Sequence, residues 1–132
     1  EANLQIRRKY WKMMNAGLKD VEGITLPPDE QPGTVHARHI YAILLDLEKL
    51  KISRNKFIDA LKAEGIGAGI HFDPVPLHKF YREKFGFKKG GYPKAEYIGQ
   101  RTVSLPFYPH MSEQDVNDVI EAVRKIVEYY KK

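Results

Sequence analysis

The chain has 132 residues, a length typical of one domain with a single hydrophobic core. Hydrophobic residues make up 42% and charged residues 30%, which excludes a disordered chain and a fibrous repeat. The formal net charge is +5, and the chain contains no cysteine. Disulfides, thiolate nucleophiles, zinc ribbons and iron–sulfur clusters are therefore excluded.

The N-terminal region and the apolar runs indicate the compartment in which the protein works. Residues 1–20 carry several basic side chains but no apolar stretch behind them, so they do not form a signal peptide. The longest apolar run, residues 40–45, is far shorter than a membrane span. We therefore expect a cytoplasmic protein with no membrane partner. The chain begins at Glu1 rather than at methionine, from which we expect that a preceding segment has been removed.

Residues 2–19 are predicted to form the first helix. Its apolar residues form two adjoining stripes, so a wide surface of this helix needs to be covered. Because a small isolated domain would leave Tyr10 or Trp11 poorly covered, this surface predicts a neighbouring domain outside the chain. Gly23 and the two prolines at 27–28 then end the segment.

Three strands are predicted farther along the chain. Residues 39–47 are apolar nearly throughout, which is typical of a central strand. Residues 66–72 are predicted as the second strand, in which Gly67 and Gly69 would let another chain or a ligand approach closely. Residues 101–105 are predicted as the third strand.

Further helices are predicted between these strands. Ser53 is expected to cap a helix that ends at Gly65 and whose buried residues are Phe57, Ile58 and Leu61. Residues 73–92 are expected to be mostly loop, with a helical turn at 79–84. Pro93 then opens a short helix.

The last helix has the clearest amphipathic pattern in the chain. Ser112 and Asp115 have the spacing of a capping box. One face of the following helix is predicted to be buried and consists of Val116, Val119, Ile120, Val123, Ile126, Val127 and Tyr130. The order of elements predicts an α+β fold, in which helices pack on one side of a small antiparallel or mixed three-stranded sheet. Residues 1–132 are expected to form a single domain.

The positive charge is concentrated in one segment, residues 79–94, which we call the basic segment. Against Glu83 alone it carries six basic residues, Lys79, Arg82, Lys84, Lys88, Lys89 and Lys94, and this excess equals the net charge of the chain. Glycine and aromatic residues are interspersed among them. Three interpretations are open: a solvated loop, a site for a phosphate-bearing ligand, and a nucleic-acid surface with stacking aromatics.

The residues alone reveal no catalytic constellation. Residues 53–56 match Ser-x-x-Lys, but the partner motifs of penicillin-binding enzymes are absent, so we interpret them as a helix cap followed by solvent-facing residues. His71, Asp73 and His78 fit no standard ligand spacing, so no metal site is predicted. Residues 71–78 instead suggest a rigid binding rim at a strand end; the alternative is an ordinary connecting loop that carries surface histidines.

Several motifs follow one another in an informative order. Residues 52–55 read Ile-Ser-Arg-Asn, residues 60–72 read Ala-Leu-Lys-Ala-Glu-Gly-Ile-Gly-Ala-Gly-Ile-His-Phe, residues 81–85 read Tyr-Arg-Glu-Lys-Phe, and residues 104–109 read Ser-Leu-Pro-Phe-Tyr-Pro. With the closing amphipathic helix, this series resembles the C-terminal domain of the DegT–StrS family of sugar aminotransferases. Within that family it is most similar to enzymes that aminate C4 of a UDP-linked 4-keto sugar for lipopolysaccharide or other polysaccharide synthesis.

The resemblance implies properties of a longer enzyme. Such enzymes have fold type I, use pyridoxal 5'-phosphate, take the amino group from glutamate and are usually homodimers. Their large N-terminal domain carries the Schiff-base lysine and the cofactor phosphate site, and those motifs are missing here. The resemblance thus implies that residues 1–20 are an inter-domain helix. It also implies that this chain has no catalytic or cofactor-binding residue, binds no cofactor by itself and is inactive alone.

The resemblance also implies a substrate-binding site. His71 and Phe72 match a His-Tyr or His-Phe pair at the mouth of the family's active site, and His78 matches the histidine that ends the same loop. Phe72 lacks the hydroxyl group that many relatives have. Lys79 and Arg82 of the basic segment would attract the diphosphate of the sugar nucleotide.

Two other functions are considered. The chain could be a free-standing basic α+β module that binds nucleic acid through residues 79–94, or a domain kept only for subunit contacts. Nucleic-acid modules usually spread their charge over a face built from regular elements. Confinement of the charge to one segment favours the aminotransferase interpretation.

Overall fold

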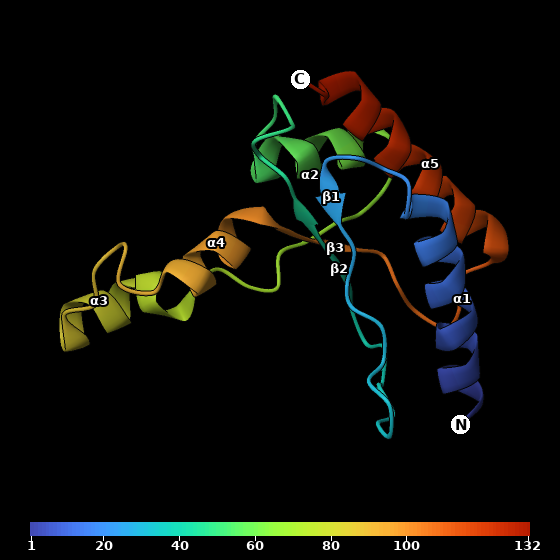
Figure 1. Cartoon of the computed structure of the whole chain (residues 1–132), viewed down its shortest axis with the longest axis horizontal. Coiled ribbons are helices and arrows are strands. Elements are labelled where there is room, and N and C mark those ends of the chain that lie inside the picture. Colours follow the sequence, from blue (N-terminus) through green and yellow to red (C-terminus); the bar gives the residue numbers. More distant parts are fainter.

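A computed structural model describes residues 1–132 and contains helices and a small sheet (Figure 1). The elements in chain order are α1 (Ala2–Leu18), β1 (Ile24–Thr25), β2 (Tyr41–Leu45), α2 (Arg54–Ala63), the 3₁₀ helix η1 (Val75–Leu77), α3 (Lys79–Phe85), α4 (Pro93–Arg101), β3 (Thr102–Leu105) and α5 (Glu113–Tyr130).

The sheet has three strands in the order β1-β2-β3, and both pairs are antiparallel. The central strand β2 alternates, with Tyr41, Ile43 and Leu45 buried and the residues between them half-buried. Strand β3 is buried along its whole length. The predicted α+β fold with a three-stranded antiparallel sheet is thus confirmed, and β2 is central as expected.

One predicted strand is wrong. Residues 66–72 make only a single antiparallel bridge, in which Gly69 and Ser104 exchange two backbone hydrogen bonds of 3.0 and 2.8 Å. Glycine stabilises an extended strand poorly, so pairing at this edge of β3 does not propagate beyond Gly69. The remaining strand of the sheet is β1, which has two residues, too few to produce a recognisable alternation.

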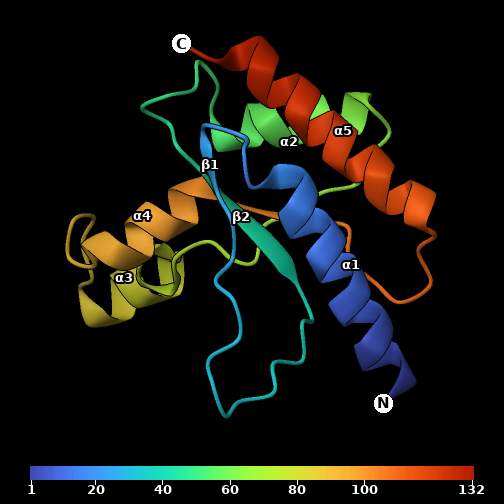
Figure 2. The ribbon, with the colours of Figure 1, turned by 45° about the vertical axis from the view of Figure 1, so that its right-hand side comes forward.

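Helices α1, α2 and α5 share one hydrophobic core with the sheet (Figure 2). The capping box of α5 is present: the Ser112 hydroxyl accepts a hydrogen bond from the Asp115 amide at 3.1 Å, and the Asp115 carboxylate accepts one from the Ser112 amide at 2.7 Å. These bonds lower the pKa of Asp115. The predicted face of α5 is buried except for Tyr130, which is half-buried.

The expectation that Tyr10 or Trp11 would be poorly covered is wrong. Their exposed fractions are only 8% and 3%. The Trp11 ring packs edge-on against Tyr41 at 4.8 Å between centroids, and the guanidinium of Arg38 lies 4.6 Å from the Trp11 ring. The connection between β1 and β2 thus folds over α1, so these two rings are covered within the chain.

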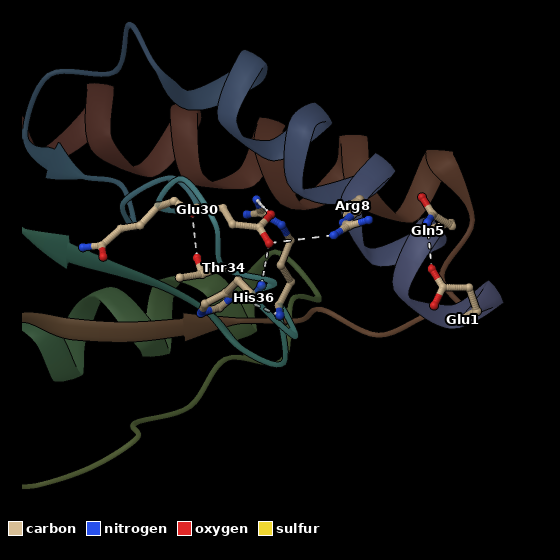
Figure 3. A network of polar contacts seen from close by, with 8 residues as sticks. Glu1, Gln5, Arg8, Glu30, Thr34 and His36 are labelled. Carbon is tan, nitrogen blue, oxygen red and sulfur yellow. Dashed lines mark hydrogen bonds and ion pairs between the residues drawn. The ribbon is translucent and has the colours of Figure 1, made fainter.

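The connection over α1 is fixed by a polar network around Glu30 (Figure 3). The Glu30 carboxylate accepts a hydrogen bond from the His36 amide at 2.6 Å and pairs with Arg38 at 3.2 Å and Arg8 at 3.7 Å. The hydrogen bond from the His36 amide is the main cause of the lowered pKa of the Glu30 carboxyl group. This network holds Arg38 over Trp11 and therefore supports the core.

Helices α3 and α4 extend away from the body formed by α1, α2 and α5 (Figure 1). The predicted helical turn at 79–84 is confirmed as α3, which has no buried residue, and the helix predicted at Pro93 is confirmed as α4. We call residues 73–101 the arm. None of the helices combines the length and apolar character needed to cross a bilayer.

Candidate functional site

His71 and Phe72 lie just beyond the Gly69 bridge, where the chain leaves the edge of β3. The Nδ1 atom of His71 is 2.9 Å from the hydroxyl of Ser104, a buried residue of β3. The two rings of the pair meet edge-to-face with centroids 4.9 Å apart, and 72% of Phe72 is exposed. The sheet therefore fixes one nitrogen of His71, so that Nε2 is the ring nitrogen left for a ligand.

His78 lies at the start of the arm, immediately before α3. Its Nε2 atom is 3.3 Å from the backbone carbonyl oxygen of Asp73. Together with the turn of η1, this contact closes the loop at residues 73–78. The loop is thus an ordered structure, as its two prolines predict, although its side chains are largely exposed.

The structure separates the predicted site residues into different hollows. A cavity of about 390 Å³ is lined by Arg54, Asp73, Pro74, Leu77, His78, Gly99 and Gln100. A second one, of about 530 Å³, is lined by Lys79, Arg82, Glu83, Gly86, Phe87 and Lys88. His71 and Phe72 line neither. The five residues therefore do not share one pocket: they are spread along the chain between Gly69 and α3, a stretch that we call the rim.

The aromatic rings of the basic segment pack mainly on one another. Tyr81 stacks on Phe85 at 5.9 Å and on Phe87 at 6.3 Å between centroids. The Lys84 ammonium lies 5.1 Å from the centre of the Phe80 ring. This small cluster supports α3, and it leaves the lysines of the segment in solvent, where they can act on a distant charge.

Glu96 is a residue of the arm that the sequence does not single out. It is buried, and its carboxylate accepts hydrogen bonds from the amides of Gly90 at 2.8 Å and Tyr92 at 3.3 Å. The glycine turn that follows Lys88 and Lys89 is therefore held in place by a side chain of α4. A charged residue in a short helix that follows a basic, Gly-rich stretch usually faces solvent, so the sequence gives no sign of this role for Glu96.

Arg54 is the second functional candidate that the sequence does not reveal, and the interpretation of Arg54 as solvent-facing is wrong. Its side chain is only 13% exposed. The guanidinium donates hydrogen bonds to the Asp73 carboxylate at 3.2 Å and to the Gly99 carbonyl. The helix cap itself is confirmed: the Ser53 side chain accepts from the Lys56 amide.

The structure offers little that could hold a metal or cofactor. No three His, Asp or Glu side chains gather into a group that could bind a metal ion. The lysines that line hollows are exposed, both in the arm and in the hollows beside α1 and α5. A lysine that forms a Schiff base is typically enclosed in an apolar pocket, and none of these lysines is. The residues of this chain thus do not fit a pyridoxal phosphate site on their own.

Comparison with known proteins identifies relatives over nearly the whole chain. The model of the DegT/DnrJ/EryC1/StrS aminotransferase family matches residues 1–124. The uncharacterized protein MJ1066 of Methanocaldococcus jannaschii is 45% identical over 121 residues, which cover 92% of this chain and 31% of that protein. The spore coat polysaccharide biosynthesis protein SpsC of Bacillus subtilis is 44% identical over 110 residues, 83% of this chain and 28% of SpsC.

Solved structures with the same fold are also found. The PLP form of Spr1654 from Streptococcus pneumoniae superposes with a TM-score of 0.86 and 26% identity, over 96% of this chain and 32% of Spr1654. S. venezuelae DesV, solved with a ketimine intermediate, superposes with a TM-score of 0.81 and 27% identity, over 96% of this chain and 32% of DesV. The chain thus spans about a third of the length of these relatives.

Proposed function

This chain belongs to the DegT/DnrJ/EryC1/StrS aminotransferase family, and from this premise we propose that it is the C-terminal small domain of a sugar-nucleotide aminotransferase. The enzyme would use pyridoxal 5'-phosphate to move an amino group from glutamate to C4 of a UDP-linked 4-keto sugar. Its product would enter the synthesis of lipopolysaccharide or another polysaccharide. The observation that carries the proposal is the family match over residues 1–124.

Several findings support parts of this proposal. SpsC is named for spore coat polysaccharide biosynthesis, and Spr1654 has been solved in PLP and PMP forms. Because this chain spans about a third of such proteins and does not fit the cofactor by itself, we assign the cofactor to a missing large domain. We further propose that residues 1–20 join the two domains and that the enzyme is a homodimer in the cytoplasm.

The rim from His71 to Arg82 is proposed to bind the sugar nucleotide. The Nδ1 atom of His71 is engaged by Ser104, so Nε2 would contact a sugar hydroxyl or phosphate. The exposed ring of Phe72 would pack against the apolar face of the sugar. Lys79 and Arg82 would attract the diphosphate without a fixed geometry, which suits their exposed positions on α3. Bound cofactor would supply the carbanion chemistry.

The first prediction tests whether cofactor binding and amino transfer need the large domain. The full-length enzyme, mixed with pyridoxal phosphate, is expected to show the visible absorbance band of covalently held cofactor and to transfer an amino group from glutamate to a UDP-4-keto hexose. The 132-residue chain is expected to do neither, because each of its lysines is exposed rather than enclosed in a pocket. Stoichiometric cofactor binding with glutamate turnover by the chain alone would contradict the assignment, whereas weak labelling of surface lysines would not.

The second prediction concerns the charge of the rim. Replacing Lys79 or Arg82 with alanine in the full-length enzyme is expected to raise KM for the sugar nucleotide by about 3- to 10-fold at low ionic strength. The difference from wild type should shrink as salt is added, since exposed charges are screened over about 10 Å at 0.1 M. Steady-state kinetics at several salt concentrations measure this. Lys19, exposed at the far end of α1, provides the control variant Lys19→Ala, for which KM should not change.

A further inference from the structure

The start of the arm is held in place by contacts with α2 and α4, two helices that are distant in sequence. Arg54, in the first turn of α2, donates hydrogen bonds both to the Asp73 carboxylate and to the Gly99 carbonyl of α4. Both bonds come from Nη1, and the Nε–H group donates to the side-chain oxygen of Asn55 at 3.1 Å. One largely buried guanidinium therefore connects α2, the loop at residues 73–78 and the C-terminal part of α4.

The loop at residues 73–78 is also held by close packing of Pro74 against Gly99 of α4. A Cβ atom added at Gly99 would lie 2.3 Å from Cγ and 2.5 Å from Cδ of the Pro74 ring, distances that real Cβ atoms do not show. Any side chain at this position would therefore push the loop away from α4. Gly99 is itself buried, so the two segments are in direct contact.

The contacts of Arg54 determine position more than stability. Asp73 is 63% exposed, and an ion pair with one exposed partner contributes little to the free energy of unfolding. The position of Asp73 matters in another way, because its backbone carbonyl contacts the ring of His78 and its neighbour is Phe72. A displacement of Asp73 would therefore move both Phe72 and His78.

We propose that Arg54 is a positioning residue for the substrate rim: by tying Asp73 to Gly99 it sets the separation of His71 and His78. The inference rests on the proposed function for its kinetic consequence, but not for its structural one. Arginine suits this role because the two N–H groups of Nη1 point in fixed directions within the guanidinium plane, one toward each acceptor, while Nε–H is held by Asn55. Lysine carries the same charge without that geometry.

Hydrogen exchange of the 132-residue chain tests the structural part. The amides of Leu77 and His78 donate to Pro74 and Val75 within the loop, at 2.8 and 3.1 Å. In Arg54→Lys they are expected to exchange about tenfold faster or more, because the loop opens locally more often. The amides of Gly69 and Ser104, which pair at the sheet edge, should keep their rates.

The matched control for this variant is Arg124→Lys. Arg124 also bonds a carboxylate, that of Asp20, and a glycine carbonyl, that of Gly17, but it joins α5 to the C-terminal end of α1 and not to the arm. The Arg124→Lys variant should leave the exchange rates of the Leu77 and His78 amides unchanged. Unchanged exchange in Arg54→Lys as well would overturn the proposal, whatever the enzyme's activity.

Kinetics of the full-length enzyme test the link to the substrate. Arg54→Lys and Gly99→Ala are expected to lower kcat/KM for the sugar nucleotide about tenfold or more, with the KM for glutamate unchanged. Arg124→Lys, the control used for hydrogen exchange, should have wild-type kinetics. Faster loop exchange without a kinetic change would overturn the substrate role of Arg54. Absence of transfer activity in the wild-type enzyme would instead count against the proposed function, while the exchange result still decides the structural claim.

Discussion

Replacement of Trp11 by alanine is expected to lower the free energy of unfolding of the chain by about 3–5 kcal/mol, the range found for large aromatic residues removed from cores. Trp11 is only 3% exposed and lies between the rings of Tyr41 and Phe107 and under the guanidinium of Arg38. Loss of the indole would remove all three contacts and leave a cavity that the sheet and α1 cannot close.

Urea denaturation of the chain measures this effect, and the neighbouring residue provides the control. Lys12 is exposed, so Lys12→Ala should change the unfolding free energy by no more than about 0.5 kcal/mol. If the two variants unfolded at the same urea concentration, α1 would not be part of this core in solution. A helix that packs chiefly on another domain would give that result.

The second large effect is expected on catalysis. In the full-length enzyme, His71→Ala should lower kcat/KM for the sugar nucleotide by about 10- to 100-fold, the loss expected for a hydrogen bond to a charged or strongly polar group. His78→Ala should have a smaller effect, because its ring has only a long contact to the Asp73 carbonyl, whereas His71 is anchored to buried Ser104. Steady-state kinetics measure both, and melting temperatures should change little.

His110 is the matched control for these two variants. It is exposed, lies between β3 and α5, and lines neither hollow of the arm. His110→Ala should therefore have wild-type kinetics. Equal kinetics for His71→Ala and His110→Ala would contradict a substrate role and show that residues 71–78 only connect two parts of the chain.

The elements that the sequence predicts well are those whose signals are local. Helix α5 combines a capping box at Ser112 and Asp115 with a long apolar face, so its start and its buried residues are both correct. Helix α2 has its cap at Ser53 and ends before Gly65, which has a positive φ of 79°. In each case the pattern spans several turns, and the termini carry their own chemistry.

The errors arise where structure depends on partners far away in the chain. Strand β1 is defined only by its pairing with β2, and residues 66–72 have the composition of a strand but bridge β3 only at Gly69. Trp11 is covered by Arg38 and Phe107, and neither of these contacts leaves a trace in the pattern of the helix itself. Tertiary context thus decides what periodicity leaves open.

The same distinction applies to the candidate site. The order of the motifs predicts the rim residues, including His71 and His78. The sequence does not indicate Arg54 or Glu96, because each is a charged residue in a helix, a pattern that normally indicates a solvated face. Their roles come from contacts with Gly99 and with the turn at Gly90, which only the folded chain brings into reach.

Photo-crosslinking is the most direct test of the claim that the sugar nucleotide meets the rim on this domain. The full-length enzyme would be irradiated with a UDP-hexose that carries a diazirine on its sugar ring, and the labelled peptides would be identified by mass spectrometry. Label is expected within residues 69–88, and unmodified UDP-hexose should compete it away. Competable label found only outside this segment would contradict the proposed substrate role of the domain.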